Sequence, residues 1–336
     1  MSKGKVLVTG GAGFIGAHVA LNLLELGYEV VVLDDLSGGF KENIPAGAQF
    51  VEGNVLDHCR LERLFRENGF RCVFHLAAYA AEGLSHFIKR FNYNNNVIGS
   101  VNLINESVKN NIECFVFTSS IAVYGTNQLP MNEELTPNPE DSYGIAKFCV
   151  ERELQVSKEM FGLNHIIFRP HNVYGEMQNL GDKYRNVIGI FMNLIMQNQP
   201  VPVFGDGEQT RAFSYVRDIS PVIAQSIETL ACYNQIFNIG ADKNYSINQL
   251  ANLVGKAMGR EVKKAHLEPR HEVLHAYSDH RKVKTFFPNA PSTSIEEGIA
   301  RMAEWAKKTG IRSSKDFAEI ELTKNLPPSW SSKHVG

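Results

Sequence analysis

An α/β fold with a doubly wound parallel sheet and a smaller C-terminal lobe is the fold class that the sequence predicts. Short apolar runs alternate with helical patterns across the first half of the chain, as they do where helices connect the strands of a parallel sheet. A glycine-rich junction, TGGAGFIG at residues 9–16, joins the first apolar run to the first helical pattern. After about Arg169 the alternation gives way to polar, loop-like sequence.

The elements follow in order along the chain. Apolar runs bounded by polar or turn residues predict strands at Lys5–Thr9, Glu29–Asp34, Gln49–Glu52, Cys72–Leu76, Cys114–Thr118 and His165–Arg169. Apolar residues at helical spacing predict helices between them, notably Phe14–Leu26, Asn95–Lys109 and Ser142–Phe161. Residues 187–198 predict a further helix, and residues 200–218 predict strands and turns. We expect this second region to lie over the C-terminal edges of the strands, where open sheets bind ligands.

Composition and charge argue against several classes of protein. The chain has 336 residues, which suffices for one large or two unequal domains. Its 34 basic and 36 acidic residues are interspersed, so nothing favours binding to nucleic acid or to a charged membrane. No apolar run approaches a membrane span, and a strand begins almost at once, so we expect a cytoplasmic protein without a signal peptide. The five widely spaced cysteines favour reduced thiols, and neither they nor the eleven histidines predict a metal site.

The glycine-rich junction predicts a dinucleotide site. Gly10, Gly11, Gly13 and Gly16 lie between a strand and a helix, where a backbone without side chains can approach a pyrophosphate beside the helix N-terminus. A tight turn that only packs the helix on the sheet is the alternative. Asp34, 18 residues after Gly16, ends the second strand near the expected spacing for an acid that binds the adenine ribose. Because this carboxylate would repel a 2′-phosphate, the cofactor is predicted to be NAD rather than NADP.

A tyrosine and a lysine at helical spacing predict the catalytic chemistry. Tyr143 and Lys147 are four residues apart on the helix Ser142–Phe161, so they project from one face. An ammonium near a phenol lowers its pKa, which would make the tyrosine a proton acceptor. Ser120 follows a buried strand and is placed to hydrogen-bond the same substrate oxygen. Each feature alone also fits a surface pair or a helix cap, but together with the glycine junction they favour an enzyme.

These motifs resemble the extended short-chain dehydrogenase/reductase superfamily, and within it the nucleotide-sugar epimerases and dehydratases. The resemblance covers roughly Lys5 to Lys307 and is carried by TGGAGFIG, by TSSIAVYG at residues 118–125 and by SYGIAK at residues 142–147. It implies a Rossmann-type NAD-binding domain at residues 1–170, to which later segments return. It further implies a lobe that binds the nucleotide-sugar, mainly at residues 171–320, followed by a polar tail at 321–336.

The resemblance also implies site residues. The implied catalytic residues are Ser120, Tyr143 and Lys147. The implied NAD-binding residues are Gly10, Gly13, Phe14, Ile15, Gly16, Asp34, Asn54, Val55, Leu76, Ala77, Ala78, Asn96, Tyr143, Lys147 and Pro170. The implied substrate-binding residues are Ser120, Tyr143, Asn172, Arg185, Asn186, Val187, Val203, Phe204, Arg211 and Arg270. Arg211 and Arg270 are implied to bind the diphosphate, because the guanidinium fork pairs with phosphate oxygens bidentately.

The implied reaction is 4-epimerisation of a UDP-sugar. A dehydratase, decarboxylase or reductase of the same superfamily is the second alternative. Dehydratases and decarboxylases usually carry an acid where this chain has Ala122, which argues against them. An NAD-sensing regulator is the third, although such proteins often lose the Tyr–Lys pair that is present here. In the implied epimerase, Tyr143 takes the proton of the 4-hydroxyl while the C4 hydride moves to NAD. The 4-keto sugar then rotates about its diphosphate linkage and is reduced on its other face.

The sequence leaves the sugar open between UDP-glucose/UDP-galactose and UDP-glucuronate/UDP-galacturonate. Asn54 replaces a common aspartate but keeps an acceptor for the adenine. No lysine stands near Ala80, where glucose/galactose epimerases have one. Arg185 would suit a C6 carboxylate, and the tail segment KNLPPSW resembles that of epimerases of uronic acids, which tips a nearly even choice slightly towards the acid.

A homodimer is also expected, by analogy with the family. Its interface would be the helices Asn95–Lys109 and Ser142–Phe161. The first of these carries an apolar stripe of Val97, Val101, Leu103 and Ile104, which equally suits packing against the sheet.

Overall fold

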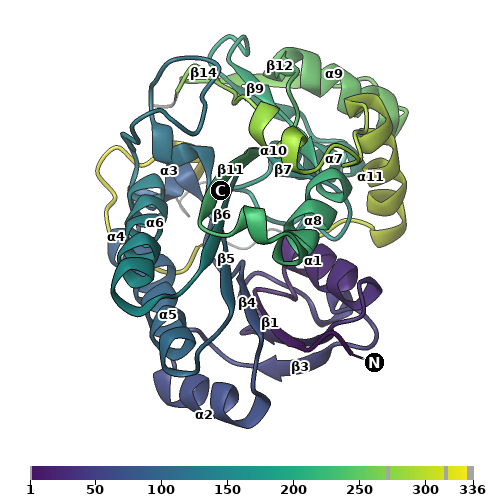
Figure 1. The fold of residues 1–336 in the computed structure, drawn as a ribbon. Helices are drawn as coiled ribbons and strands as arrows, with labels where there is room; N and C mark the ends of the chain where they lie inside the picture. The colour runs from purple at the N-terminus through teal and green to yellow at the C-terminus, as the bar shows by residue number, and fades with distance from the viewer. Residues whose placement is uncertain (1, 270–272, 314–316, 331–336) are drawn as a thin grey trace.

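A seven-stranded, all-parallel sheet forms the centre of the protein in a computed structural model, which describes residues 2–269, 273–313 and 317–330 (Figure 1). The strand order is β11-β6-β5-β4-β1-β2-β3. The strands are β1 (Lys5–Thr9), β2 (Glu29–Asp34), β3 (Gln49–Glu52), β4 (Cys72–His75), β5 (Cys114–Thr118), β6 (His165–Pro170) and β11 (Gln235–Ile239). Both faces of the sheet are covered, which explains why its strands are nearly continuous apolar runs.

Helices pack on both faces of this sheet. One face is covered by α1 (Phe14–Glu25), α8 (Val216–Gln225) and α10 (Arg281–Phe286), and the other by α2 (His58–Asn68), α5 (Gly99–Lys109) and α6 (Ser142–Phe161). Side chains alternate between the two faces along each strand, so Val6 and Val8 of β1 contact the first helix layer and Leu7 the second. The short helices α3 (Glu82–Ser85) and α4 (Lys89–Tyr93) precede α5.

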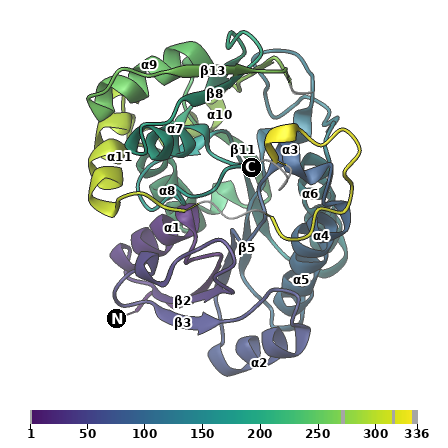
Figure 2. The ribbon, with the colours of Figure 1, turned by 180° about the vertical axis from the view of Figure 1, so that it is seen from behind.

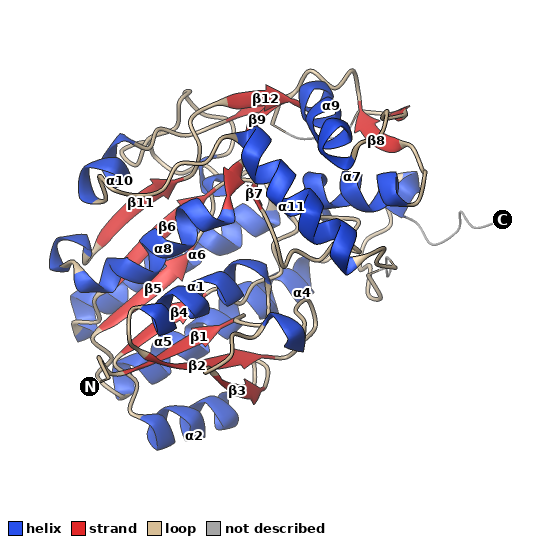
Figure 3. Ribbon diagram, turned by 90° about the vertical axis from the view of Figure 1, so that its right-hand side faces the viewer, coloured by secondary structure: helices blue, strands red, loops and turns tan. Residues whose placement is uncertain are grey.

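An outer lobe lies beyond the C-terminal ends of the strands (Figure 3). Its helices are α7 (Val187–Met196), α9 (Ile247–Met258) and α11 (Ile295–Thr309). Its strands are β7 (Val173–Tyr174), β8 (Val201–Phe204), β9 (Thr210–Ala212), β10 (Ser214–Tyr215), β12 (Asn244–Ser246), β13 (Lys264–Leu267) and β14 (His275–Ala276), in three small sheets. The three helices share a separate apolar core that includes Phe191, Val254 and Met302. Within the described residues, no helix is long and apolar enough to cross a membrane, and no group of acidic, histidine or cysteine side chains could hold a metal.

Local sequence explains where α6 begins and ends and where α9 begins. Asp141 caps α6 by accepting the N–H of Gly144 at 2.8 Å, and Gly162 ends the helix with a positive φ of 76°. In α9, Ser246 and Gln249 form a reciprocal capping box. Local sequence therefore fixes both ends of α6, which carries Tyr143 and Lys147.

The predicted α/β class is confirmed, and the predicted strands are all present. Two elements differ. The helix expected at Asn95–Lys109 begins with a π-helical turn, Asn94–Ile98, before α5 continues as a regular helix. The seventh strand, β11, was not predicted, because it lies in the less regular second half of the chain and its neighbour β6 is about 70 residues earlier.

Candidate active site

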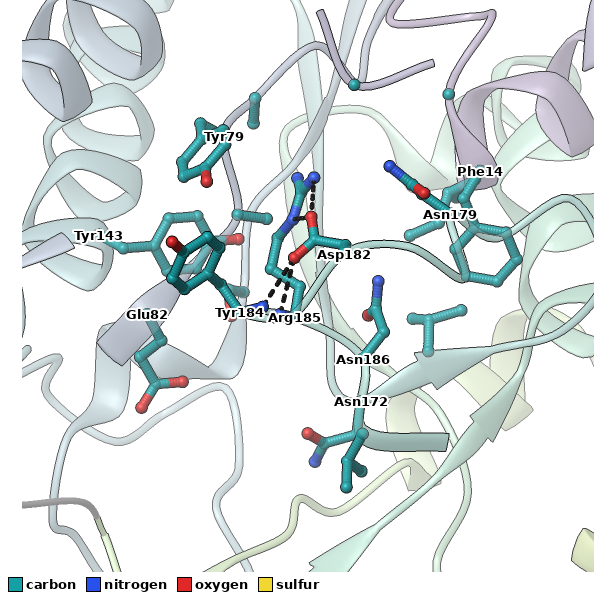
Figure 4. A pocket seen from close by; sticks show the side chains of 18 of the residues that line it. Phe14, Tyr79, Glu82, Tyr143, Asn172, Asn179, Asp182, Tyr184, Arg185 and Asn186 are labelled. Carbon is teal, nitrogen blue, oxygen red and sulfur yellow. Dashed lines mark hydrogen bonds and ion pairs between the residues drawn. The ribbon is translucent and has the colours of Figure 1, made fainter. Parts of the chain in front are cut away.

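A cavity of about 670 Å³ lies between the C-terminal ends of the sheet strands and the outer lobe. Figure 4 shows it from close by, with side chains from both parts of the molecule pointing into it. Residues of the glycine junction, of the ends of β2, β4 and β5, of α6 and of α7 all line it. The cavity is therefore at the position where open α/β sheets bind ligands.

The glycine junction forms a close turn at one end of this cavity. Gly10 has a φ of +71°, and a Cβ there would lie 2.6 Å from the backbone N of Ala77. A Cβ on Gly16 would lie 2.1 Å from the carbonyl oxygen of Gly10, so this glycine is required for packing α1 on the turn. Gly13 immediately precedes α1 and lines the cavity, which leaves the helix N-terminus accessible to a phosphate group.

Asp34 is held in place at the end of β2. Its two carboxylate oxygens accept the backbone N–H groups of Ala12 at 3.0 Å and Leu36 at 2.8 Å. Burial raises the pKa of Asp34, and these two hydrogen bonds oppose the rise. Asp34 lines the cavity beside the glycine junction, the arrangement that a ribose of a dinucleotide requires.

Most of the predicted cofactor-binding residues line the cavity. Besides the glycines and Asp34, these are Phe14, Ile15, Val55, Leu76, Ala77, Ala78, Tyr143, Lys147 and Pro170. The buried hydroxyl of Thr118, another lining residue, has no partner among the described residues, so it is available to a ligand. A backbone cradle without side chains, a fixed carboxylate and an unpaired hydroxyl together fit NAD.

Two predicted cofactor residues point elsewhere. The side chain of Asn54 donates to Asp35 at 2.7 Å and accepts the N–H of Leu56 rather than lining the cavity. Asn96 is buried, with its amide bonded to the backbone of Tyr79 at 2.8 and 3.1 Å, so it fixes the loop after β4. Its neighbour Asn95 lines the cavity instead. Within a run of three asparagines, sequence alone does not fix which one faces the site.

Ser120, Tyr143 and Lys147 come together at the centre of the cavity. The ammonium of Lys147 donates to the carbonyl oxygen of Thr118 at 2.8 Å and lies 5.7 Å from the centre of the Tyr143 ring. The hydroxyl of Ser120 accepts the N–H of Ala122 at 3.1 Å, and it lowers the pKa of the neighbouring Tyr143. Tyr143 and Lys147 are 8% and 3% exposed, so both react in a largely dry environment.

The pKa shift expected for Tyr143 is wrong in direction for this structure. Burial raises the pKa of Tyr143 above its ordinary value, while the hydrogen bond with Ser120 lowers it by less. Burial also lowers the pKa of Lys147 to about 7, against the opposing charge of Glu151. Low dielectric thus disfavours both charged forms, and a positive charge bound in the cavity would favour the phenolate. The oxidised nicotinamide ring of NAD carries such a charge.

A buried network that sequence reasoning did not identify supports α6 from behind. The guanidinium of Arg169 donates to both carboxylate oxygens of Glu151, at 2.9 and 2.5 Å, and to the hydroxyl of Tyr124 at 2.7 Å. Tyr124 in turn donates to Asn238 on β11. Glu151 lies one helical turn after Lys147, so the network links the catalytic helix to β6 and to the far edge of the sheet.

The other end of the cavity is formed by residues 79–83 and 182–186. Arg185 donates from Nε to Asp182 at 2.6 Å, and its guanidinium lies 4.8 Å from the centre of the Tyr79 ring (Figure 4). Asn186, Asn172 and Val187, which are expected to bind the substrate, line the cavity. Tyr79, Asp182, Tyr184 and Trp330 also line it and were not predicted; they come from segments far apart in the chain.

The strands of the outer lobe supply two further predicted residues to the cavity. Phe204 and Arg211 line it, and Arg211 donates to the backbone carbonyls of Thr210 and Leu274, both at 2.9 Å. Val203 does not line it: this residue is fully buried, because alternate residues of β8 face opposite sides and Pro202 and Phe204 take the cavity side. Arg270 lies outside the described residues.

Comparisons with known proteins agree with this geometry. Residues 6–240 match the family described as the NAD dependent epimerase/dehydratase family. The chain is 35% identical to a protein of Methanocaldococcus jannaschii, provisionally named a UDP-glucose 4-epimerase, over 90% of this chain and 98% of that one. The crystal structure of the Thermotoga maritima UDP-glucose 4-epimerase with UDP-glucose is similar with a TM-score of 0.87 and 35% identity, covering 91% of this chain and 99% of that one.

A uronic acid epimerase is also similar. The UDP-glucuronic acid 4-epimerase of Bacillus cereus, solved with UDP-glucuronic acid and NAD, has a TM-score of 0.84 and 26% identity. This similarity covers 91% of the present chain and the whole of the other. Similarity of fold therefore does not distinguish a neutral sugar from an acidic one.

Proposed function

This chain belongs to the NAD-dependent epimerase/dehydratase family, and we propose that it interconverts the C4 epimers of a UDP-sugar, with NAD as its cofactor. The observation that carries the proposal is the meeting of Ser120, Tyr143 and Lys147 with the glycine junction in one cavity. A binding protein or an NAD sensor would have no need of the phenol and amine there. We also propose that residues 1–170, with β11, α8 and α10, hold NAD, and that residues 171–320 mainly hold the nucleotide-sugar.

The chemistry divides between the cofactor and this chain. When bound, NAD accepts the hydride of C4 and returns it. Tyr143 takes the proton of the 4-hydroxyl and gives it back when the 4-keto sugar is reduced on its other face. Ser120 orients the sugar oxygen through its hydroxyl, and Lys147 binds the ribose and stabilises the phenolate. Ala122 offers no acid or base for a dehydration, which favours epimerisation over the second alternative.

We place the sugar at the end of the cavity formed by residues 79–83 and 182–186, here called the sugar end, where an ion pair favours a neutral hexose over a uronic acid. Arg185 already pairs with Asp182, whose side chain is 7% exposed. A C6 carboxylate at Arg185 would have to compete with that carboxylate and would be repelled by it. We therefore propose the UDP-glucose/UDP-galactose pair as substrates, and this reverses the slight preference for a uronic acid that the tail sequence suggested.

The test is a turnover assay without added NAD. The purified protein is incubated with UDP-glucose, and UDP-galactose is separated from it by chromatography. We expect conversion without external NAD, because each cycle regenerates the cofactor. Tyr143→Phe removes one hydroxyl and should abolish conversion while still binding UDP. Conversion that is unchanged in Tyr143→Phe, or a purified active protein that contains only NADP, would contradict the proposal.

We further propose that the protein is a cytoplasmic homodimer. All five cysteines are free thiols, which suits a reducing compartment. Three exposed apolar side chains, Ile145, Val156 and Met160, lie along α6, and a fourth, Ile98, lies just before α5. Two residues of the apolar stripe that was expected at the interface, Leu103 and Ile104, are buried against the sheet and are not available to a partner. The α6 residues therefore replace them in the proposed interface.

A further inference from the structure

The C-terminal segment, residues 317–330, returns from the outer lobe and packs beside α3 and α4. Figure 2 shows it in yellow along these helices. Its backbone is fixed at several points: the N–H of Leu322 donates to the carbonyl oxygen of Phe87 at 3.1 Å. The carboxylate of Glu321 accepts the N–H groups of Arg90 at 2.9 Å and Phe91 at 2.8 Å. This segment is therefore a built part of the structure, although its sequence is polar.

An aromatic cluster joins this segment to both walls of the sugar end. The ring of Phe317 lies 5.1 Å from that of Tyr79 and 5.0 Å from that of Phe91. The N–H of Phe317 donates to the hydroxyl of Tyr184 at 3.1 Å. Tyr79 and Tyr184 both line the cavity, and they come from opposite parts of the molecule. The segment thus connects the loop after β4 with the loop before α7.

Trp330 packs in the same cluster. It is 5% exposed and packs against Ala81, Leu84 and Ile88. Its ring meets that of Tyr184 edge-on, with 5.5 Å between the ring centres. A Cβ at Gly83 would lie 3.1 Å from Cη2 of the indole, so the absence of a side chain there lets the ring approach closely.

Trp330 also borders the cavity that contains Tyr143 and Arg185. We propose that Trp330 is a specificity-determining residue, which closes the sugar end of the cavity and limits the size of the sugar that the site accepts. The proposal rests on the UDP-sugar epimerase function above. A rigid aromatic side chain that is packed on one side and borders the cavity on the other fixes the distance between the two walls. Phe204 and Arg211, which the family resemblance assigns to the substrate, line the cavity from the outer lobe.

Binding is tested first, without turnover. The chain has two tryptophans, so Trp305→Phe leaves Trp330 as the single fluorescent indole. Adding Tyr143→Phe prevents chemistry. We expect UDP-glucose to shift or quench the emission of Trp330, whereas UDP, which lacks the sugar, leaves the emission unchanged while still binding. Equal responses to UDP and UDP-glucose, or no response to either in a protein that binds both, would overturn the proposal.

Selectivity is tested next, with UDP-glucose and the bulkier UDP-N-acetylglucosamine. Trp330→Ala should raise the ratio of kcat/KM for the N-acetylated sugar to that for UDP-glucose by about tenfold or more, and Trp330→Phe should restore much of the original ratio. Leu326→Ala is the matched control, because Leu326 belongs to the same cluster but does not line the cavity. A ratio that is the same in wild type, Trp330→Ala and Leu326→Ala overturns the proposal. A wild-type protein that converts no UDP-sugar contradicts the proposed function instead, and the fluorescence titration still decides whether Trp330 meets the sugar.

Discussion

Single residues in this site have properties that differ from those their types suggest. Lys147 is surrounded by protein, so its amine loses protons near pH 7, and Arg185 is already neutralised by a neighbouring carboxylate. In both cases the surroundings, rather than the residue type, decide what the group can do. Two predictions follow from these surroundings.

The first concerns Lys147 and the stability of the ligand-free protein. The amine has an ordinary pKa of 10.5, and burial lowers it to about 7 in the folded state. Between these values the unfolded chain binds more protons than the folded one, so stability rises with pH in this window; below pH 7 the cost of burying the charge is at its full size. Lys147→Met should be more stable than wild type at pH 7, and the difference should shrink by pH 9.5.

Urea midpoints at the two pH values measure this effect. Lys256→Met, at an exposed position on α9, is the control and should leave the pH dependence of wild type unaltered. If Lys147→Met follows the same pH dependence as wild type, burial of the amine does not cost what the structure implies.

The second prediction concerns Asp182 and the choice of sugar. Asp182→Asn keeps the Oδ1 acceptor for the N–H groups of Tyr184 and Arg185, at 2.8 and 3.1 Å, but removes the charge that pairs with Arg185. The freed guanidinium should then favour a C6 carboxylate, by about tenfold or more if one charged hydrogen bond is gained. The measured quantity is the ratio of kcat/KM for UDP-glucuronate to that for UDP-glucose.

The double variant Asp182→Asn with Arg185→Ala separates charge from shape. It should lose the gain, because no cation remains to bind the acid. A wild-type enzyme that prefers UDP-glucuronate would show that the ion pair opens for substrate, and it would contradict the preference for a neutral hexose.

At the scale of elements, α6 depends on a buried ion pair for its position on the sheet. The side chains of Glu151 and Arg169 are 1% and 2% exposed, and together they link α6 to β6. Glu151→Ala should lower the free energy of unfolding by about 3–5 kcal/mol, because it leaves an unpaired guanidinium in the core. Chemical denaturation measures this loss, and activity should fall as well since Tyr143 and Lys147 are on the same helix.

An exposed pair provides the comparison. Glu297 and Arg301 pair across one turn of α11, with side chains about half exposed. Glu297→Ala should cost no more than about 1 kcal/mol. Equal losses from the two variants would mean that the buried pair is not what holds α6.

Elements also show where sequence reasoning succeeds. The buried strands and the Tyr143–Lys147 face of α6 follow from local periodicity, so they were predicted. Val203 was assigned to the substrate, but alternate residues of β8 face opposite sides and Val203 faces away from the cavity. Asn96 was assigned to the cofactor, but it lies in a π-helical turn in which its neighbour Asn95 lines the cavity. Trp330 was missed because its partners, residues 81–88 and 184, are more than 140 residues away and the tail around it is polar.

At the scale of the whole molecule, the proposed homodimer has a direct test. Ile145, Val156 and Met160 are 43%, 42% and 69% exposed on one helix, and burying them in a partner would remove apolar surface from water. Light scattering at micromolar concentration should give the mass of a dimer. Val156→Lys combined with Met160→Lys should give a monomer, because two buried charges per chain would oppose association.

Leu230→Lys is the control for this experiment. Leu230 is 75% exposed but lies on a different element, so its substitution should leave the mass unchanged. A monomer mass for the wild type would contradict the proposal, and so would a dimer that survives both lysine substitutions.

The position of Trp330 in the chain has a consequence for synthesis on the ribosome. A polypeptide emerges with its N-terminal part first. The glycine junction, Asp34, Tyr143 and Lys147 are translated early, and every other described residue that lines the cavity, up to Leu267, precedes Trp330. A nascent chain thus has the parts that hold the dinucleotide long before it has the wall that limits the sugar. Selectivity for the sugar is the last property of the site that translation completes.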